Sequence, residues 1–346
     1  MAEAGPGTVT VPPRRITIND IAEAAEVSRS TASRALTDRG YVADAARRRV
    51  LEVAESLGYV PDATARHLRR QRSNSIGVLL SDLTNSFYAE LAAGASKQAR
   101  QRSYTMVLSD AGGGDEVEAA KAFVGLRVAG VIATAVSEDV GTYLGRHGVP
   151  VVEVDRQFAE GISDAVVVDN VAGAYRTTEN LLEQGHRRVA LFIDETTWTT
   201  GRDRHAGYAQ ALAAGGLDLL PELVVSSGWD VRTALAAALR LLADDHRPTA
   251  VFAANNVLAE GVWRAAAELG LRIPEDLSLV SFDDAPWMSM VTPGVTAVAQ
   301  DVMALGETAV EMLLERLAEP DAPARTIVLP APVVHRGSTA PPAIRA

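Results

Sequence analysis

Thr17-Ile-Asn-Asp-Ile-Ala-Glu-Ala-Ala-Glu-Val-Ser-Arg-Ser-Thr-Ala-Ser-Arg-Ala-Leu36 is the stretch that decides the fold of the N-terminal region. Thr17 can cap a first helix, and Asp20, three residues later, stands where a capping box usually has Glu or Gln. Ser28 offers a second N-cap after a break at Glu26. The stretch therefore predicts two short helices joined by a tight turn, with inward-facing apolar residues at Ile18, Ile21, Ala22, Ala25, Ala32, Ala35 and Leu36.

The outer face of the second helix is polar and basic, since Arg29, Ser30 and Arg34 project from it. Short hydroxyls and arginines on a helix that another helix supports across a tight turn suit the DNA major groove. We therefore predict an all-α helix-turn-helix DNA-binding head in which these three residues read bases. The other polar residues expected to contact DNA in this stretch are Thr17, Ser28, Thr31 and Ser33. An ordinary helical hairpin is the structural alternative, but the two caps and the polar outer face favour the DNA reader.

Charge is divided unevenly along the chain. The net charge of −11 taken alone would argue against nucleic acid as a partner. Residues 14–72, however, hold 12 arginines against 8 acidic residues, whereas the remainder holds 21 basic and 36 acidic residues. A small basic head on an acidic body directs the head toward phosphate and keeps the body away from it.

The segments around the two helices complete the head. Residues 1–15, with several glycines and prolines, are typical of a disordered leader. Residues 45–57 predict a third helix that closes a small core with Val50, Leu51, Val53, Ala54 and Leu57 and ends at Gly58. Residues 61–70 could form a short helix in which Leu68 stands among arginines, and so short a helix is marginal in water. We expect it to form only against DNA or a second copy of itself.

From Ser75 onward, short apolar runs alternate with amphipathic helical stretches. The runs are 76–80, 105–108, 130–133, 150–154, 166–168, 189–193, 223–225, 250–253 and 277–282. The helical stretches include 88–100, 116–126, 172–183, 206–214, 232–243, 258–269 and 305–317. This alternation predicts an α/β body of parallel sheets covered by helices on both faces. One compact sheet does not usually contain so many strands, so we expect two lobes with a ligand cleft at the carboxyl ends of the strands.

Several function classes lack the sequence features that they require. The chain has no cysteine, no run near the roughly 18 apolar residues of a membrane span, and no apolar signal in its first fifteen residues. We therefore expect a cytoplasmic protein. The six histidines lack metal-ligand spacing, and Gly112-Gly-Gly114 lacks the ending of a phosphate loop. We expect no enzyme, cofactor or metal. A solute-binding protein is the other alternative, and the basic head argues against it.

A set of short motifs recurs in a characteristic order. The head carries Val27-Ser-Arg-Ser-Thr-Ala-Ser-Arg34, and the linker carries Leu57-Gly-Tyr-Val-Pro-Asp62. The body carries Asp82-Leu-Thr-Asn-Ser-Phe-Tyr88, Val154-Asp-Arg156, Val168-Asp-Asn170, Gly185-His-Arg-Arg-Val189, Phe252-Ala-Ala-Asn-Asn256 and Ser281-Phe-Asp-Asp284. From about Thr17 to Thr339 the chain thus resembles the lac repressor and galactose repressor family of bacterial transcription regulators.

The resemblance implies a regulator that binds a near-palindromic double-stranded DNA operator as a homodimer, with a tetramer left open. It also implies a minor-groove contact by Leu68, with Arg69 beside it, and a body like the periplasmic sugar-binding proteins. The boundaries expected are leader 1–15, head 16–60, hinge helix and linker 61–74, body 75–339 and tail 340–346. Within the body we expect a first lobe at 75–171 and 299–326 and a second lobe at 172–298 and 327–339.

The effector site that the resemblance implies combines an aromatic face, a forked donor, amides and carboxylates. Its residues are Phe87, Asp155, Arg204, Trp229, Asn255, Asp283 and Gln300. Such a set can stack a ring and hold several hydroxyls, which favours a saccharide, although a purine or nucleoside could use the same groups. Core packing of Trp198 and Trp229, a solvated Arg204 and a turn-capping Asp283 are the structural alternatives. We expect the ligand to release DNA, with ligand-promoted binding left open.

Three positions depart from the family pattern. Glu26 stands where relatives usually carry glycine, and a left-handed turn there would cost about 1 kcal/mol. Ala43 replaces the usual hydroxyl cap before the third helix, where Asp44 could substitute. Asn256 replaces an aspartate common after the cleft asparagine, which leaves that corner less acidic.

Overall fold

The computed structural model describes residues 16–37, 40–59, 73–111, 116–134, 137–158 and 161–343. The chain divides into two units, residues 1–72 and 73–346. The expected leader, the hinge segment with Leu68 and Arg69, and the triple-glycine loop lie outside the described residues.

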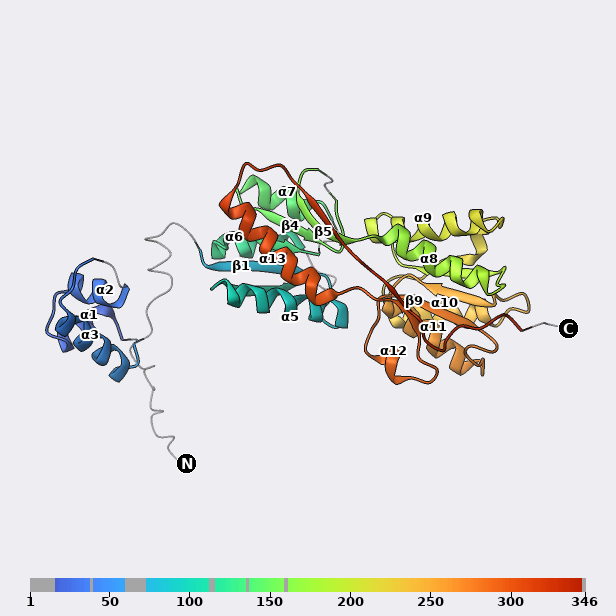
Figure 1. The fold of residues 1–346 in the computed structure, drawn as a ribbon, viewed down its shortest axis with the longest axis horizontal. Coiled ribbons are helices and arrows are strands. Elements are labelled where there is room, and N and C mark those ends of the chain that lie inside the picture. The colour runs from blue at the N-terminus through green and yellow to red at the C-terminus, as the bar shows by residue number, and fades with distance from the viewer. Residues whose placement is uncertain are drawn as a thin grey trace, which may run out of the picture. The chain divides into compact units, whose positions relative to one another are not determined.

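The head is a small helical unit with helices α1 (Ile18–Ala24), α2 (Arg29–Thr37) and α3 (Asp44–Ser56), drawn in blue in Figure 1. Ile21, Val50 and several alanines form its core. The expected capping box is present, because the Thr17 hydroxyl accepts from the Asp20 amide while the Asp20 carboxylate accepts from the Thr17 amide. Our prediction for the third helix was wrong in one respect: Leu51 and Leu57 are 47% and 40% exposed, because three helices this short bury only one face of α3.

The turn between α1 and α2 is left-handed at Glu26, whose φ is 53°. The Val27 amide donates to the Ala22 carbonyl across it, which closes the end of α1. Glycine adopts such a φ freely, whereas a residue with a Cβ is strained by about 1–2 kcal/mol. At the start of α3 the N-cap Ala43 makes no side-chain hydrogen bond, so this helix begins without a cap of the usual kind.

The first lobe of the body is a parallel sheet with helices on both faces. Its strands follow the order β11-β5-β4-β3-β1-β2. The strands are β1 (Ser75–Leu80), β2 (Thr105–Asp110), β3 (Val131–Ala133), β4 (Val151–Val154), β5 (Asp164–Val168) and β11 (Thr326–Leu329). The helices are α5 (Ser86–Gln101) and α13 (Val302–Ala318), which pack together, and α6 (Glu116–Leu126) and α7 (Asp139–Arg146), which form the second pair.

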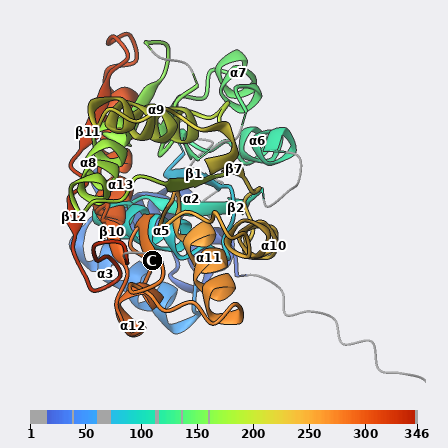
Figure 2. The ribbon, with the colours of Figure 1, turned by 90° about the vertical axis from the view of Figure 1, so that its right-hand side faces the viewer.

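The second lobe repeats this architecture with the order β12-β10-β9-β8-β6-β7, in which only the short β12 is antiparallel. Its strands are β6 (Val189–Ile193), β7 (Val224–Ser226), β8 (Ala250–Ala253), β9 (Ser278–Phe282), β10 (Thr296–Val298) and β12 (Val333–Val334). Its helices are α8 (Asn170–Glu183), α9 (Thr199–Ala214), α10 (Val231–Leu242), α11 (Asn256–Glu268) and the short α12 (Trp287–Met290). Helices α8 and α9 cover one face and α10 and α11 the other (Figures 1 and 2).

Two glycines allow the central helices of the first lobe to cross closely. A Cβ at Gly94 of α5 would lie 2.2 Å from the Met303 carbonyl oxygen, and one at Gly306 of α13 would lie 2.2 Å from that of Leu91. Neither position can therefore carry a side chain without a shift of the backbone. This contact joins segments more than 200 residues apart in the sequence, and it encloses part of the largest hydrophobic core.

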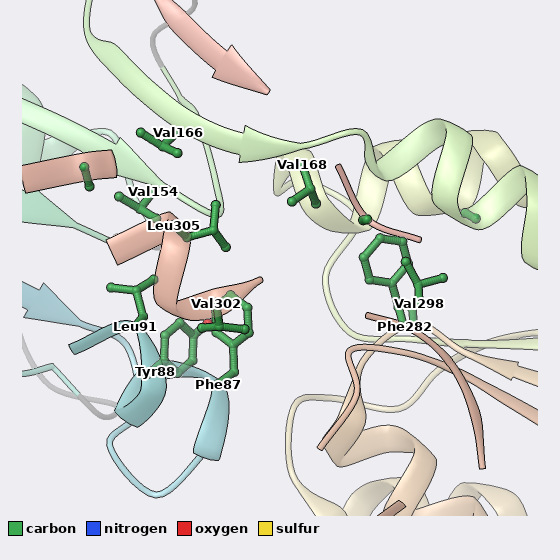
Figure 3. Close-up of a cluster of buried hydrophobic side chains, with 14 of the residues drawn as sticks. Phe87, Tyr88, Leu91, Val154, Val166, Val168, Phe282, Val298, Val302 and Leu305 are labelled. Atoms are coloured by element: carbon green, nitrogen blue, oxygen red, sulfur yellow. The ribbon is translucent and has the colours of Figure 1, made fainter. Parts of the chain in front are cut away.

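The lobes are joined, within the described residues, by three crossovers that follow β5, β10 and β11. Apolar side chains on both sides of the crossovers belong to one continuous cluster, which includes Val168, Phe282, Val298 and Val302 (Figure 3). The Ala299 amide donates to the Pro332 carbonyl, which ties two crossovers together. Our boundary at 326/327 was wrong, because Thr326–Leu329 pairs with β5 in the first sheet and the chain crosses only afterwards.

Candidate functional site

The first candidate surface is the outer face of α2. Arg29 and Ser30 are exposed at its N-terminal end, where a recognition helix meets base edges. Ser28 caps the helix, since its hydroxyl accepts from the Thr31 amide and lies 2.8 Å from the Ser30 hydroxyl. Arg34 is also exposed, and its Nε donates to the Ser30 carbonyl. Thr31 and Ser33 are half-buried, and Thr17 is engaged in capping α1.

The second candidate surface is a cavity of about 690 Å³ in the body. It is lined from both lobes by loops that follow the carboxyl ends of strands, among them Ser81, Asp155, Asp194, Asn255 and Asp283. In open α/β sheets ligands bind at this edge, so the cavity lies where the strand alternation predicted a cleft. Its volume is within the usual range for small-molecule sites.

Arg204 is the central cation of the cavity. It lies in the second turn of α9, because that helix begins at Thr199 rather than at the predicted residue 206, and only 5% of its surface is exposed. Its Nε donates to Asn170 Oδ1 at 2.9 Å, its Nη1 donates to the Ala254 carbonyl at 2.6 Å, and its guanidinium covers the Phe282 ring at 3.8 Å. The solvated alternative is therefore wrong.

Two carboxylates from different lobes face Arg204. Asp155 follows β4 of the first lobe and Asp283 follows β9 of the second, and each lies 4.0 Å from Nη2. Both residues have positive φ values, 68° and 70°, so each side chain leaves its strand at a left-handed bend. Burial raises the pKa of Asp283 to about 6 and also raises the pKa of Asp155, although Arg204 opposes both shifts.

A second buried arginine, which the sequence reading did not assign to the site, organises the first-lobe wall. Arg156 Nη2 donates to the Tyr88 hydroxyl at 2.6 Å, and Nη1 donates to the Ser81 hydroxyl at 3.0 Å. Its guanidinium also lies 4.3 Å from the centre of the Trp198 ring, which belongs to the second lobe. Burial raises the pKa of the Tyr88 hydroxyl to about 12, so that group stays protonated. The motif Val154-Asp-Arg156 carried the signal, but only the fold shows its contacts.

The tryptophans lie on the cleft side, as expected from their loops, and not in the core. Trp198 precedes α9 and Trp229 precedes α10, and their rings are stacked with centroids 6.4 Å apart. Trp229 is 66% exposed. Phe87, at the start of α5, is buried against Tyr88 and also lines the cavity.

Two predicted ligand residues are engaged by the protein itself. Asn255 Oδ1 accepts from the Leu258 amide as the N-cap of α11, while its Nδ2 donates to Asp194 at 3.0 Å. Gln300 is outside the cavity lining, and its Nε2 donates to Asp283. The structure therefore brings Phe87, Asp155, Arg204, Trp229, Asn255 and Asp283 together around one cavity and places Gln300 behind the last of these.

An uncharged contact joins the lobes beside the cavity. Asn256 Nδ2 of the second lobe donates to Asn85 Oδ1 of the first at 3.0 Å, and the reverse amide contact measures 3.4 Å. Asn85 Oδ1 also accepts from the Phe87 amide at the start of α5. Asn256 is thus used here for a reciprocal amide pair between the lobes.

The charge of the cavity is strongly negative. Among the described residues that line it, the acidic ones outnumber the basic ones by seven to two. The acidic ones are Asp82, Glu116, Asp155, Asp194, Asp230, Glu260 and Asp283, and the basic ones are Arg156 and Arg204.

Within the described ranges no group of His, Cys, Asp and Glu side chains is arranged to hold a metal ion. No helix in those ranges has the length and apolar character to span a membrane.

A helix-turn-helix unit and a two-lobed body with a ligand cavity between strand ends together define a ligand-responsive transcriptional regulator. Residues 17–62 match the family described as bacterial regulatory proteins, lacI family, and residues 178–339 match the periplasmic binding protein-like domain. The ribose operon repressor of Haemophilus influenzae is 30% identical over 93% of this chain and 98% of its own length. The chain therefore belongs to the lacI family of bacterial regulatory proteins.

Other relatives agree with this assignment. The HTH-type transcriptional repressor PurR of Erwinia tasmaniensis is 32% identical over 94% of this chain and 97% of its own length. The crystal structure of the lac repressor dimer bound to operator and the anti-inducer ONPF superposes with a TM-score of 0.85, at 27% identity over 94% of this chain and all of that one. The predicted fold class and the function as a DNA-binding transcriptional regulator are thereby confirmed.

Proposed function

We propose that this protein is a cytoplasmic repressor whose homodimer binds a near-palindromic operator and is released by an uncharged sugar bound between the lobes. The observation that carries the proposal is Arg204, buried between a carboxylate of the first lobe and one of the second. A ligand that hydrogen-bonds to Asp155 and Asp283 touches both lobes at once. It can therefore favour one lobe arrangement, which is the requirement for coupling to the DNA-binding head.

The chemistry of the cavity supports a hydroxyl-rich ligand without negative charge. Carboxylates accept hydrogen bonds from hydroxyls, and aromatic rings stack on the apolar faces of sugar rings. Both arginines are already held by protein partners, so the carboxylate excess would repel a phosphate or carboxylate group on a ligand. A purine base or nucleoside is uncharged too and remains the second candidate, because the relative named PurR shares the same architecture.

The size of the DNA-reading surface supports homodimerisation. One α2 helix reaches only a few base pairs, whereas a two-fold pair doubles the contacts and sets the half-site spacing. Arg29 and Ser30 would read bases, and Leu68, with Arg69 beside it, would contact the minor groove.

Ligand response is tested with Arg204→Ala and Asp283→Ala in the full chain. Both variants should lose sugar-induced operator release, measured by fluorescence anisotropy of labelled operator, while operator binding remains measurable. Coupling of about 1–3 kcal/mol between ligand and operator would be typical. The matched control is Arg202→Ala, because Arg202 lies on the same helix but points to solvent. If both cavity variants respond like the parent, the cavity is not the effector site.

Ligand class is tested by thermal stabilisation of the protein with sugars, nucleosides and phosphorylated sugars. Stabilisation by uncharged sugars alone supports the proposal, whereas stabilisation by nucleosides alone transfers it to the second candidate.

Base reading is tested with Arg29→Ala, which should change operator preference by about 1–3 kcal/mol at one base pair. Arg48→Ala, which removes an exposed arginine from α3, is the control for charge loss alone.

A further inference from the structure

The guanidinium of Arg156 lies in the cavity wall, but the protein itself uses its hydrogen-bond donors. Nη2 donates to the Tyr88 hydroxyl at 2.6 Å, while Nη1 donates to the Ser81 hydroxyl at 3.0 Å and to the Thr134 carbonyl at 3.3 Å. Nε lies 3.7 Å from the carboxylate of Asp155, and only 7% of the Arg156 surface is exposed. The planar fork of an arginine matches the oxygens of a carboxylate or phosphate. The cavity thus contains a group suited to anions whose fork is directed at protein acceptors.

The acceptors of Arg156 come together because the parallel strands end at one edge of the first sheet. Ser81 follows β1, Thr134 follows β3, and Tyr88 lies in the first turn of α5. The Ser81 hydroxyl also donates to the Thr134 carbonyl, so two of the acceptors are themselves joined. The network therefore lies within one lobe and does not depend on the angle between the lobes.

The two arginines of the cavity differ in what would release them. Arg204 donates to the backbone carbonyl of Ala254, which no substitution removes. The shortest hydrogen bond of Arg156 goes instead to the side chain of Tyr88, and phenylalanine has the same ring without that oxygen. Tyr88 is 6% exposed and lines the cavity beside Arg156. Burial raises the pKa of its hydroxyl to about 12, so this neutral group occupies a donor of Arg156 without cancelling the charge.

Removal of the Tyr88 hydroxyl would leave Nη2 of Arg156 without this acceptor. A buried charged donor that loses its partner is unfavourable, and an oxygen atom of a ligand can relieve it. A carboxylate or phosphate oxygen forms a charge-assisted hydrogen bond, which is about twice as strong as one to a neutral hydroxyl. The Tyr88 hydroxyl therefore decides whether a ligand gains affinity by carrying a negative charge.

On the basis of the proposed sugar response, we propose that Tyr88 is a specificity-determining residue that excludes acidic sugars from the cavity. Its hydroxyl occupies the Arg156 donor that a carboxylate or phosphate on a sugar requires, while the carboxylates of Asp155 and Asp283 repel such a group. With phenylalanine in place of Tyr88, the guanidinium becomes available to the ligand, and the cavity accepts acidic sugars beside neutral ones.

The test is isothermal titration of the full chain with pairs of a neutral sugar and an acidic derivative: glucose with glucuronate, galactose with galacturonate, and ribose with ribose 5-phosphate. In the pair whose neutral sugar binds most tightly, the parent should prefer that sugar by about tenfold or more. Tyr88→Phe should reduce this ratio by about tenfold, because it strengthens binding of the acidic sugar. Tyr208→Phe is the matched control, since it also removes a buried hydroxyl, one that donates to the Val189 carbonyl in the second lobe.

Ser81→Ala tests the same guanidinium through its other terminal nitrogen. It should shift the ratio in the same direction by a smaller factor, because Nη1 keeps the Thr134 carbonyl as an acceptor. Thermal stabilisation of each variant by the sugar that it binds shows that a changed ratio does not arise from misfolding.

The outcomes separate this inference from the proposed function. If neutral sugars bind and Tyr88→Phe leaves the ratio as it is in the parent, or if Tyr208→Phe changes it equally, the role of Tyr88 is refuted while the sugar response stands. If the parent binds an acidic sugar as tightly as the neutral one, the exclusion itself is refuted. If no sugar binds and a nucleoside does, the proposed function fails and the inference fails with it.

Discussion

The buried carboxyl of Asp283 makes the stability of the body depend on pH in a way that one substitution removes. Burial raises its pKa from 3.8 to about 6 in the folded protein, whereas an unfolded chain has the ordinary value. At pH values between these two pKa values, the folded state binds more protons than the unfolded state. Its stability therefore falls as pH rises through this interval and becomes constant above it. Asp283→Asn keeps the shape of the side chain and abolishes the titration.

The magnitude follows from the same linkage. The full interval between the two pKa values corresponds to ~3 kcal/mol of folding free energy, and about 2 kcal/mol of it falls between pH 4.5 and 7.5. Relative to the parent protein, Asp283→Asn should therefore gain about 2 kcal/mol of stability when pH is raised from 4.5 to 7.5. The neutral side chain can still accept the hydrogen bond from Gln300, so the local contact is conserved.

The assay is urea unfolding at the two pH values, followed by tryptophan fluorescence. All 4 tryptophans lie in the body, so the signal does not include the head. Glu268→Gln, which replaces an exposed carboxylate at the end of α11, is the control for removal of a charge elsewhere in the same lobe. If Asp283→Asn shows the same pH dependence as the parent protein within ~0.5 kcal/mol, the burial argument is refuted.

Three further predictions concern Glu26, Ala43 and Asn256. Glu26→Gly should stabilise the head by about 1 kcal/mol because it relieves the left-handed backbone, as thermal unfolding followed by far-ultraviolet circular dichroism would show. Ala43→Ser should stabilise it by roughly 0.5–2 kcal/mol in the same assay by supplying the missing cap of α3; no gain would mean that α3 frays there. Asn256→Ala should remove the amide pair with Asn85, so small-angle scattering should show a larger radius of gyration for the ligand-free protein; an unchanged value would contradict a role in holding the lobes.

The strands that the sequence predicted are those that form continuous apolar runs, whereas the short amphipathic helix α7 was not predicted. All nine predicted strands occur in the structure, as do the seven helices predicted for the body and the three predicted for residues 17–57. The strands that escaped prediction, β10, β11 and β12, have 2–4 residues each, and β11 alternates between exposed and half-buried positions because it lies at a sheet edge. The first turns of α9 were not predicted, because Thr199-Thr-Gly201 has no apolar pattern. In the structure, a Cβ at Gly201 would meet the Glu195 carbonyl.

Six of the seven residues predicted for the site line one cavity, but Gln300 does not, and neither the place of Arg156 nor the partners of these side chains could be predicted. Positions after strands identify residues that reach the cleft, since all parallel strands end at the same edge. Whether a polar side chain there faces a ligand depends on contacts between distant segments. Asn255 bonds to Asp194, and Arg156 bonds to Tyr88, across 61 and 68 residues. The pairing of Asn85 with Asn256 also required the arrangement of both lobes.

The three crossovers between the lobes are the segments at which a hinge motion of the body would occur. A change of the angle between the lobes needs only small changes of backbone torsion in each segment, whereas independent movement of two of the segments is restrained by the hydrogen bond from the Ala299 amide to the Pro332 carbonyl. A ligand that contacts both lobes would therefore act on the angle at these segments, and ligands of different size would set different angles.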